Sequence, residues 1–454
     1  MIARGLLLRR AWWPLLPPAF VALAMTACSS SNDDSPFPVP ESDAGQTATE
    51  PDASSTPEAD GGIDSGEVEV ETPPYDFEVK CTAAPCVTRL AARGGSHACA
   101  ILRGGSVRCW GANAFGQVGK SGDGAGAMPV FVAAPTEVPG ISGAVGLSAS
   151  GDRDRGTSCV VSGSGSVSCF GSDASGQLGR GEAPSTTPHP EAVELADVRA
   201  KSVTLAGTFA FAIGTDDRLW SWGANEGYQL ARPTAVDAGV ASAPAPAESI
   251  SFTPRSCAGT STTSFVVSAN GELLSWGGAT LETLGRLSSL TRDPVPTPIA
   301  LSEVSRVAAG SSHACALRRA QVHCWGKNEH GQLGSGTVAD QPLPLRAVLP
   351  SGVLAVDVAA GGDNTCIIAS SGDVHCWGAN GGGQVGGSAG VDQPSARRID
   401  GLTEAAVALG VMDRSVCALL RGGAVTCWGD NLLGQLGRGA RDVELHAPGP
   451  VVFQ

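Results

Sequence analysis

The sequence contains little charge and lacks several motifs that mark common chemistries. Charged residues make up 16% of the 454 residues, against about 25% in typical soluble domains. No complete Gly-x-x-x-x-Gly-Lys-Ser/Thr phosphate loop occurs, and no dinucleotide-binding glycine fingerprint opens a predicted helix. No Cys-x-x-Cys pair occurs either, so the usual ligand spacing of a structural zinc site is missing. We therefore expect no cofactor and no metal.

Glycine is abundant where charge is scarce. The chain has 61 glycines, about twice the usual share. A glycine inside a helix costs about 1 kcal/mol relative to alanine, so this composition disfavours long helices. The formal net charge is −14, which argues against a nucleic-acid partner because phosphate neutralisation requires clustered lysine and arginine. Fourteen cysteines indicate an oxidising compartment unless they bind metal.

Residues 1–28 have the features of an export signal. Three arginines within the first ten residues precede an uncharged stretch, residues 11–27, whose prolines suit a membrane-spanning helix poorly. Its end, Met25-Thr26-Ala27-Cys28, resembles the lipobox of bacterial lipoproteins, in which Cys28 would be acylated and become the mature N-terminus. The alternatives are a signal peptide that is cut elsewhere and an uncleaved anchor. We expect an exported cell-envelope protein with a lipid anchor, at the outer membrane or cell surface.

Residues 29–80 form a separate compositional segment, rich in serine, proline and acidic side chains. It holds fourteen acidic residues and one basic residue, Lys80, so it carries nearly all of the net charge. It has few large apolar side chains and cannot bury enough surface to offset its chain entropy. We expect a disordered linker that holds a folded domain, residues 81–454, clear of a lipid surface.

Residues 81–454 contain an internal repeat. Its clearest copy, residues 307–334, reads VAAGSSHACALRRAQVHCWGKNEHGQLG. Seven copies follow one another at a period of about 50 residues, which is typical of propellers and solenoids. Each copy carries one aromatic residue directly before a glycine, and these are Trp110, Phe170, Trp222, Trp276, Trp325, Trp377 and Trp428.

Within each copy, short apolar runs alternate with glycine-rich turns, which predicts about four short strands per copy. Seven four-stranded units predict an all-β, seven-bladed β-propeller, whose radial packing protects the sheet edges. A β-solenoid would have shorter coils and no long loops. In the fourth copy, residues 278–285 lack the Asn and Gln of the other copies, which leaves the regularity of that blade open.

The recurring pattern Gly-x-x-His-x-Cys/Ala-Ala-Leu, followed by Trp-Gly-x-Asn-x-x-Gly-Gln-Leu/Val-Gly, resembles the repeat of the regulator of chromosome condensation family. The resemblance implies a seven-bladed propeller and a family whose members typically bind protein partners. Because the motif recurs in most copies, we expect its residues to form the scaffold, with the glutamines bonding backbone groups of a neighbouring blade. These residues are Trp110, Gly111, Gln117, Gln177, Trp222, Trp276, Trp325, Gly326, Gln332, Trp377, Gln384, Trp428 and Gln435.

Five copies carry a cysteine pair that brackets a predicted hairpin turn. The two members of a pair face each other in an antiparallel hairpin, close enough for a disulfide. The other two copies have Phe211 with Ser221 and Phe265 with Ser275, so they lack both cysteines rather than one. We predict disulfides, against the alternatives of buried free thiols and metal binding, and we predict that Cys257 is a buried free thiol. The pairs are Cys99 with Cys109, Cys159 with Cys169, Cys315 with Cys324, Cys366 with Cys376, and Cys417 with Cys427, and Cys81 with Cys86 is a possible sixth.

Three further features could carry chemistry. His97 and His313 occupy one repeat position, which favours a structural role over a ligand or base. Residues 386–390 match Gly-x-Ser-x-Gly, but no predicted helix follows, as a nucleophile elbow requires. The loop containing Asp152, Arg153, Asp154 and Arg155 is longer than its equivalents and lacks calcium-ligand spacing, so it is either a partner-contact loop or simple loop drift.

A propeller does not by itself determine a function. We expect a non-enzymatic, monomeric, membrane-tethered scaffold that binds an unidentified protein partner on one propeller face and binds no nucleic acid. One alternative is guanine-nucleotide exchange, the activity of the family's eukaryotic founder. The other is a propeller enzyme acting on cell-surface carbohydrate, which would need carboxylates or histidines clustered at one mouth of the channel.

Overall fold

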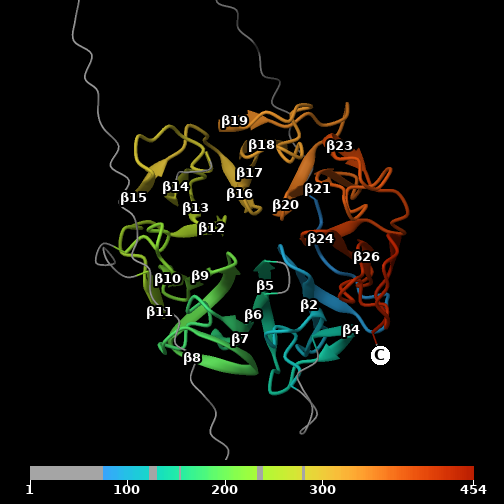
Figure 1. The fold of residues 1–454 in the computed structure, drawn as a ribbon, viewed down its shortest axis with the longest axis horizontal. Helices are drawn as coiled ribbons and strands as arrows, with labels where there is room; N and C mark the ends of the chain where they lie inside the picture. Colours follow the sequence, from blue (N-terminus) through green and yellow to red (C-terminus); the bar gives the residue numbers. More distant parts are fainter. Residues whose placement is uncertain (1–74, 122–129, 153–154, 233–238, 279–281, 454) are drawn as a thin grey trace, which may run out of the picture. The chain divides into compact units, whose positions relative to one another are not determined.

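The computed structural model describes residues 75–121, 130–152, 155–232, 239–278 and 282–453. The expected signal peptide, Cys28 and most of the expected linker lie outside these ranges. The described residues form 27 β-strands in six antiparallel sheets and contain no helix that could cross a membrane. Five sheets have four strands, and the sixth has seven because one long strand, β8 (Ser185–Leu205), serves two blades. The fold is therefore an all-β propeller of seven blades (Figure 1).

The blades follow one another along the chain. Blade 1 comprises β1 (Val87–Ala91), β2 (His97–Leu102), β3 (Val107–Ala112) and β4 (Phe131–Glu137). Blade 2 comprises β5 (Ala144–Asp152), β6 (Arg155–Ser162), β7 (Ser166–Asp173) and the first part of β8. Blade 3 comprises the second part of β8, then β9 (Phe209–Gly214), β10 (Leu219–Ala224) and β11 (Val240–Pro246). Blade 4 comprises β12 (Pro254–Gly259), β13 (Thr263–Ser268), β14 (Leu273–Gly278) and β15 (Arg292–Pro298).

The remaining three blades have the same composition. Blade 5 comprises β16 (Val304–Ala309), β17 (His313–Arg318), β18 (Gln321–Gly326) and β19 (Gln341–Arg346). Blade 6 comprises β20 (Ala355–Gly361), β21 (Asn364–Ala369), β22 (Val374–Gly378) and β23 (Gln393–Arg398). Blade 7 comprises β24 (Ala406–Val411), β25 (Ser415–Leu420), β26 (Val425–Gly429) and β27 (His446–Pro450). Blade 4 is thus as regular as its neighbours, although its turn lacks the Asn and Gln.

Each blade places its first strand at the centre of the ring and its fourth strand at the rim, as β16 and β19 show in Figure 1. The second strands are almost wholly buried, for example all six residues of β13. The rim strands contain proline, such as Pro342 and Pro344 in β19. Because proline has no N–H to donate, these exposed edges are poor templates for pairing with another chain.

Seven hydrophobic clusters hold the ring together, one at each junction between neighbouring blades. Each cluster contains the fully buried Trp or Phe of one third strand. The cluster around Trp110 combines blade 1 with Val407 and Leu419 of blade 7. The junction that closes the ring is therefore packed like the other six.

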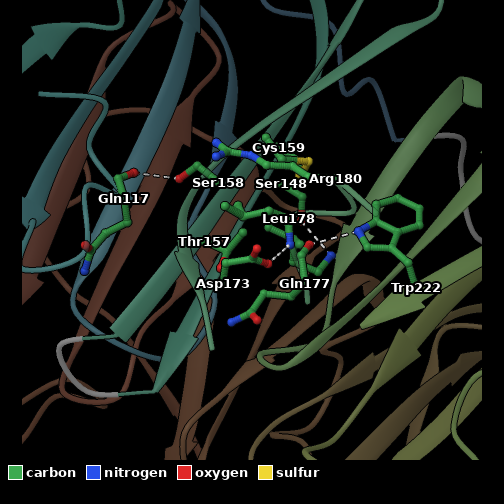
Figure 2. The surroundings of a disulfide bond; sticks show 12 residues. Gln117, Ser148, Thr157, Ser158, Cys159, Asp173, Gln177, Leu178, Arg180 and Trp222 are labelled. Atoms are coloured by element: carbon green, nitrogen blue, oxygen red, sulfur yellow. Dashed lines mark hydrogen bonds between the residues drawn. A yellow bond between two sulfur atoms is a disulfide. The ribbon is translucent and has the colours of Figure 1, made fainter. Parts of the chain in front are cut away.

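A hydrogen bond accompanies the packing at each junction. The indole Nε1 of Trp222 donates to the backbone carbonyl of Gln177 in the preceding blade at 2.9 Å (Figure 2). The other five tryptophans of the motif make the same bond at 2.8 to 2.9 Å. Phe170 cannot donate, and in its junction the Gln117 carbonyl accepts from the hydroxyl of Ser158 at 2.8 Å (Figure 2).

The glutamine and glycines of the turn shape this joint. The Oε1 of Gln332 accepts from the backbone N–H of His330 at 2.9 Å, which closes the turn on itself. The Nε2 of Gln384 donates to the backbone carbonyl of Asp413 in the next blade at 3.3 Å. Gly334 has φ +68°, and a Cβ there would lie 2.7 Å from the Nε1 of Trp377. Glycine is therefore required where the turn meets the indole.

The N-terminal end of the described chain adds to the closure. A parallel bridge joins Arg93 to Val411, and the N–H of Gly94 donates to the Val411 carbonyl at 2.9 Å. The hydroxyl of Tyr75 donates to the Ala406 carbonyl at 2.6 Å, and the N–H of Lys80 donates to the Arg421 carbonyl at 2.8 Å. Residues 75–80 thus pack on blade 7. Residues 75–80 therefore belong with the propeller rather than with the linker to which the sequence assigned them, because the partly buried Tyr75 and Val79 pack against blade-junction clusters.

The first prediction concerns Trp377, which is fully buried at the junction of blades 5 and 6. Trp377→Ala should lower the free energy of unfolding by about 3–5 kcal/mol, because it leaves a cavity in the junction. Trp377→Phe should cost only about 1 kcal/mol, because the Gln332 carbonyl keeps a second donor, the Thr365 hydroxyl at 2.9 Å. Urea unfolding of the oxidised protein, followed by circular dichroism, measures both.

Trp220 is the matched control. It is half-buried, and its indole bonds Asp216 of its own blade rather than a neighbouring turn. Trp220→Ala should cost clearly less than Trp377→Ala. Equal losses for the two alanine variants would show that the junction contact has no special weight.

Candidate functional site

The paired cysteines lie opposite each other on the second and third strands of five blades. Cys99 faces Cys109, with a Cα–Cα distance of 4.1 Å and an S–S distance of 2.05 Å. The other four blade pairs are also bonded, with Cα–Cα distances of 4.0 to 4.2 Å. These four are Cys159 with Cys169, Cys315 with Cys324, Cys366 with Cys376, and Cys417 with Cys427. All ten of these cysteines are fully buried, so they belong to the scaffold.

The remaining described cysteines lie outside the blade hairpins. Cys81 and Cys86 form a sixth disulfide, just before β1. Cys257 is a buried free thiol on β12. Burial raises the pKa of this thiol to about 11, so it is protonated and unreactive at neutral pH.

His97 and His313 each link two blades. The Nε2 of His97 lies 3.1 Å from the Ser158 hydroxyl, and that of His313 lies 2.8 Å from the Thr365 hydroxyl. Burial lowers the pKa of His97 to about 4 and that of His313 to about 3. Both imidazoles are therefore neutral at pH 7, and neither is among the residues that line the two channel cavities described below.

The predicted contact loop is described in part. Asp152 and Arg155 pair at the ends of β5 and β6, while Arg153 and Asp154 lie outside the described residues. The Arg155 guanidinium lies over the Phe115 ring, 5.5 Å from its centroid. Asp152 lines one mouth of the central channel. A role of this loop in partner contact stays a prediction.

A single arginine crosses the central channel. Arg93 follows β1, and its guanidinium donates to the backbone carbonyls of three other blades: Ala309 at 2.8 Å, Leu205 at 2.7 Å, and Gly259. These carbonyls are equivalent, because each ends the inner strand of its blade. Burial lowers the pKa of Arg93 to about 10, so the side chain remains charged at neutral pH.

Arg93 divides the channel into two cavities. The cavity toward the start of the inner strands has a volume of about 430 Å³. The cavity toward the end of the inner strands has a volume of about 280 Å³ and is lined mainly by glycine, serine and threonine of the first turns. Among the residues described as lining them, the larger cavity has no carboxylate and the smaller has only Asp152. No group of described side chains is arranged to hold a metal ion.

The long loops between third and fourth strands emerge together on one face of the ring, because all third strands run in the same direction. We call this the loop face. Large aliphatic side chains are exposed on it in five of the seven blades. They are Val130, Leu287, Leu290, Val338, Val391, Leu432, Val443 and Leu445, and Val443 reaches 81% exposure.

The sequence alone did not single out Arg93. Its signal is a length difference: His97 follows Ala92 by five positions in the first copy, whereas His313 follows Ala309 by four in the fifth. Arg93 stands in this longer turn. The sequence shows that the turn containing Arg93 has one extra residue. Which carbonyls the Arg93 side chain reaches follows only from the closed ring.

Comparisons with known proteins agree with this architecture. Residues 87–117, 304–332 and 355–384, and also residues 320–368, match the regulator of chromosome condensation (RCC1) repeat. The chain is 28% identical over 366 residues to the ultraviolet-B receptor UVR8 of Arabidopsis thaliana, covering 79% of this chain and 80% of that protein. It is 30% identical over 249 residues to the human E3 ubiquitin-protein ligase HERC2, covering 52% of this chain and only 5% of HERC2.

Among solved structures, Prp20p from Saccharomyces cerevisiae has a TM-score of 0.65 at 18% identity, covering 77% of this chain and 86% of that chain. A likeness at this identity concerns the fold alone. The matched repeats form blade junctions with their Trp and Gln, so this chain carries repeats of the regulator of chromosome condensation (RCC1) type in a seven-bladed propeller.

Proposed function

We propose that this protein is a non-enzymatic scaffold that binds a protein partner through the loop face and is tethered to a membrane outside the cytoplasm. The observation that carries the proposal is the set of exposed valines and leucines on the loop face. The side chains of the repeated motif pack between neighbouring blades, whereas these loop side chains are exposed to solvent. Eight of the sixteen large hydrophobic side chains exposed in the described residues lie in these loops, and exposed apolar patches are typical of protein-binding surfaces.

Related proteins support an interaction role. The solved structure of Prp20p is described together with its binding to Gsp1p and histones. A second structure shows Kap60 bound to the same yeast protein. For this chain we infer only that it binds a protein. The relatives do not identify its partner.

The channel supports a role without catalysis. Hydrolysis of a glycosidic bond usually needs two carboxylates about 5–9.5 Å apart. The described lining of the two cavities offers one, Asp152. This lining does not favour carbohydrate hydrolysis. Guanine-nucleotide exchange does not depend on the channel and stays an alternative by family analogy.

The expected export signal and the six disulfides support the location. Disulfides persist in secreted and envelope proteins and are rare in the cytosol. The lipobox-like Cys28 would supply the anchor, and the acidic segment after it would act as the spacer.

The second prediction tests the loop face. A photoreactive amino acid at Val391 or Val443 should capture the same protein on intact cells, because both side chains lie on that face. The double variant Val443→Glu with Leu445→Glu should lose capture at Val391 without a change in melting temperature, because both residues are exposed.

Two controls lie on the opposite face. A photoreactive residue at Ser164, in the turn between β6 and β7, should not capture this protein. Val145→Glu changes another exposed valine, near the other channel mouth, and should leave capture intact. Capture from Ser164, or loss of capture in Val145→Glu, would contradict binding by the loop face.

The third prediction tests export. Protein isolated from cells and denatured without reductant should react with a thiol reagent at one cysteine, Cys257. After reduction, the twelve bonded cysteines should react as well. Mass spectrometry of the labelled peptides measures this. Free thiols at the five blade pairs before reduction would mean that the protein resides in a reducing compartment.

A further inference from the structure

Three arginines line the larger channel cavity, Arg93, Arg255 and Arg306, and no carboxylate is among its described lining residues. Each inner strand starts with a β-bulge, and residues of the bulges on blades 3 to 5, such as Arg255 and Arg306, line this cavity. Bulges often re-aim side chains next to binding sites. The seven bulges supply four cations, Arg89, Lys201, Arg255 and Arg306, and one carboxylate, Asp357.

Three of these cations lie on consecutive blades. Lys201, Arg255 and Arg306 belong to blades 3, 4 and 5, the same blades whose carbonyls hold Arg93. Lys201 is paired with Asp217, and Arg306 contacts Asp357 at 2.8 Å. Arg255 is exposed and has no ion-pair partner within the described part of the chain.

Arg93 forms the floor of this cavity and also lacks a counter-ion among the described residues. Its three carbonyl contacts use three of the five N–H groups of a guanidinium. Carbonyl dipoles solvate the cation, but they do not neutralise it. A buried charge is costly unless it is paired, so a bound anion would lower the energy of this arrangement.

The remaining lining combines hydroxyls with an apolar wall. Ser202, Thr204, Ser256 and Ser305 line the cavity on blades 3 to 5. The other side is aliphatic and consists of side chains such as Val358, Leu409 and Val411 on blades 6 and 7. Glu78 and Asp357 line a neighbouring cleft and are absent from the lining of this cavity. A volume of about 430 Å³ is within the range of small-molecule sites, which combine apolar lining with a few placed polar groups.

We propose that this cavity binds a small organic anion, with its oxyanion head between Arg255 and Arg93 and a short apolar body against blades 6 and 7. The site is separate from the loop face, because the cavity opens at the start of the inner strands. It therefore goes beyond the proposed scaffold role.

Calorimetric titration of the purified full-length protein tests the site with phenyl phosphate, benzoate and inorganic phosphate, at about 20 mM ionic strength, where screening is weak. Phenyl phosphate or benzoate should bind saturably at one site, and phenyl phosphate should bind at least five-fold more tightly than inorganic phosphate. Arg255→Gln should weaken binding at least five-fold. The matched control Arg346→Gln, which removes an exposed arginine at the rim on β19, should change the affinity less than two-fold.

A second variant adds charge instead of removing it. Ser256→Asp places a carboxylate beside Arg255 and should abolish binding, whereas Ser164→Asp in an exposed turn should not. The melting temperatures of all four variants show that the fold is kept. Equal losses in Arg255→Gln and Arg346→Gln, or equal affinities for phenyl phosphate and inorganic phosphate, would overturn the assignment. Absence of saturable binding by all three probes would overturn it as well.

Discussion

Every junction of the ring depends on one contact, in which an aromatic side chain of one blade packs against the glycine-rich turn of the preceding blade. In six junctions the indole also donates to a carbonyl of that turn. The contact between Trp110 and Gln435 is the same bond made between the last and first blades. Because stability in repeat proteins comes largely from neighbour interfaces, a ring with seven such interfaces has no free end to fray.

This contact also divides each long loop into a fixed base, which belongs to the scaffold, and an exposed part, which belongs to the surface. The turn that receives the indole is the root of the long loop between the third and fourth strands. The root is fixed by glutamine and glycine, as Gln332 and Gly334 show, while side chains further along the loop reach solvent. Loops that are anchored at their base can vary in sequence without disturbing the ring. The loop-face valines and leucines stand in this variable part.

The parts of the structure that could be predicted from the sequence are those with a local signal. The spacing of the aromatic residues predicted seven blades, and the cysteine spacing predicted pairs that face each other across a hairpin, as Cys315 and Cys324 do. The seven-stranded sheet and the packing of Tyr75 on blade 7 could not be predicted. Both features depend on contacts between segments that are far apart in the sequence. The acidic residues around Tyr75 made this segment resemble a disordered linker, although Tyr75 packs on blade 7.

The contacts of Arg93 also depend on distant segments and could not be predicted from the sequence. They show how a single residue can make one part of a repetitive ring different from the rest. A seven-fold ring offers equivalent carbonyls around its axis, and one side chain can reach only some of them. Arg93 reaches those of blades 3, 4 and 5, on the side where Lys201, Arg255 and Arg306 also lie. Together with the hydroxyls of Ser202, Ser256 and Ser305, Arg93 makes one side of the channel polar, whereas Val358, Leu409 and Val411 make the other side apolar. Such an asymmetric lining can orient a ligand, which a ring of identical blades could not do.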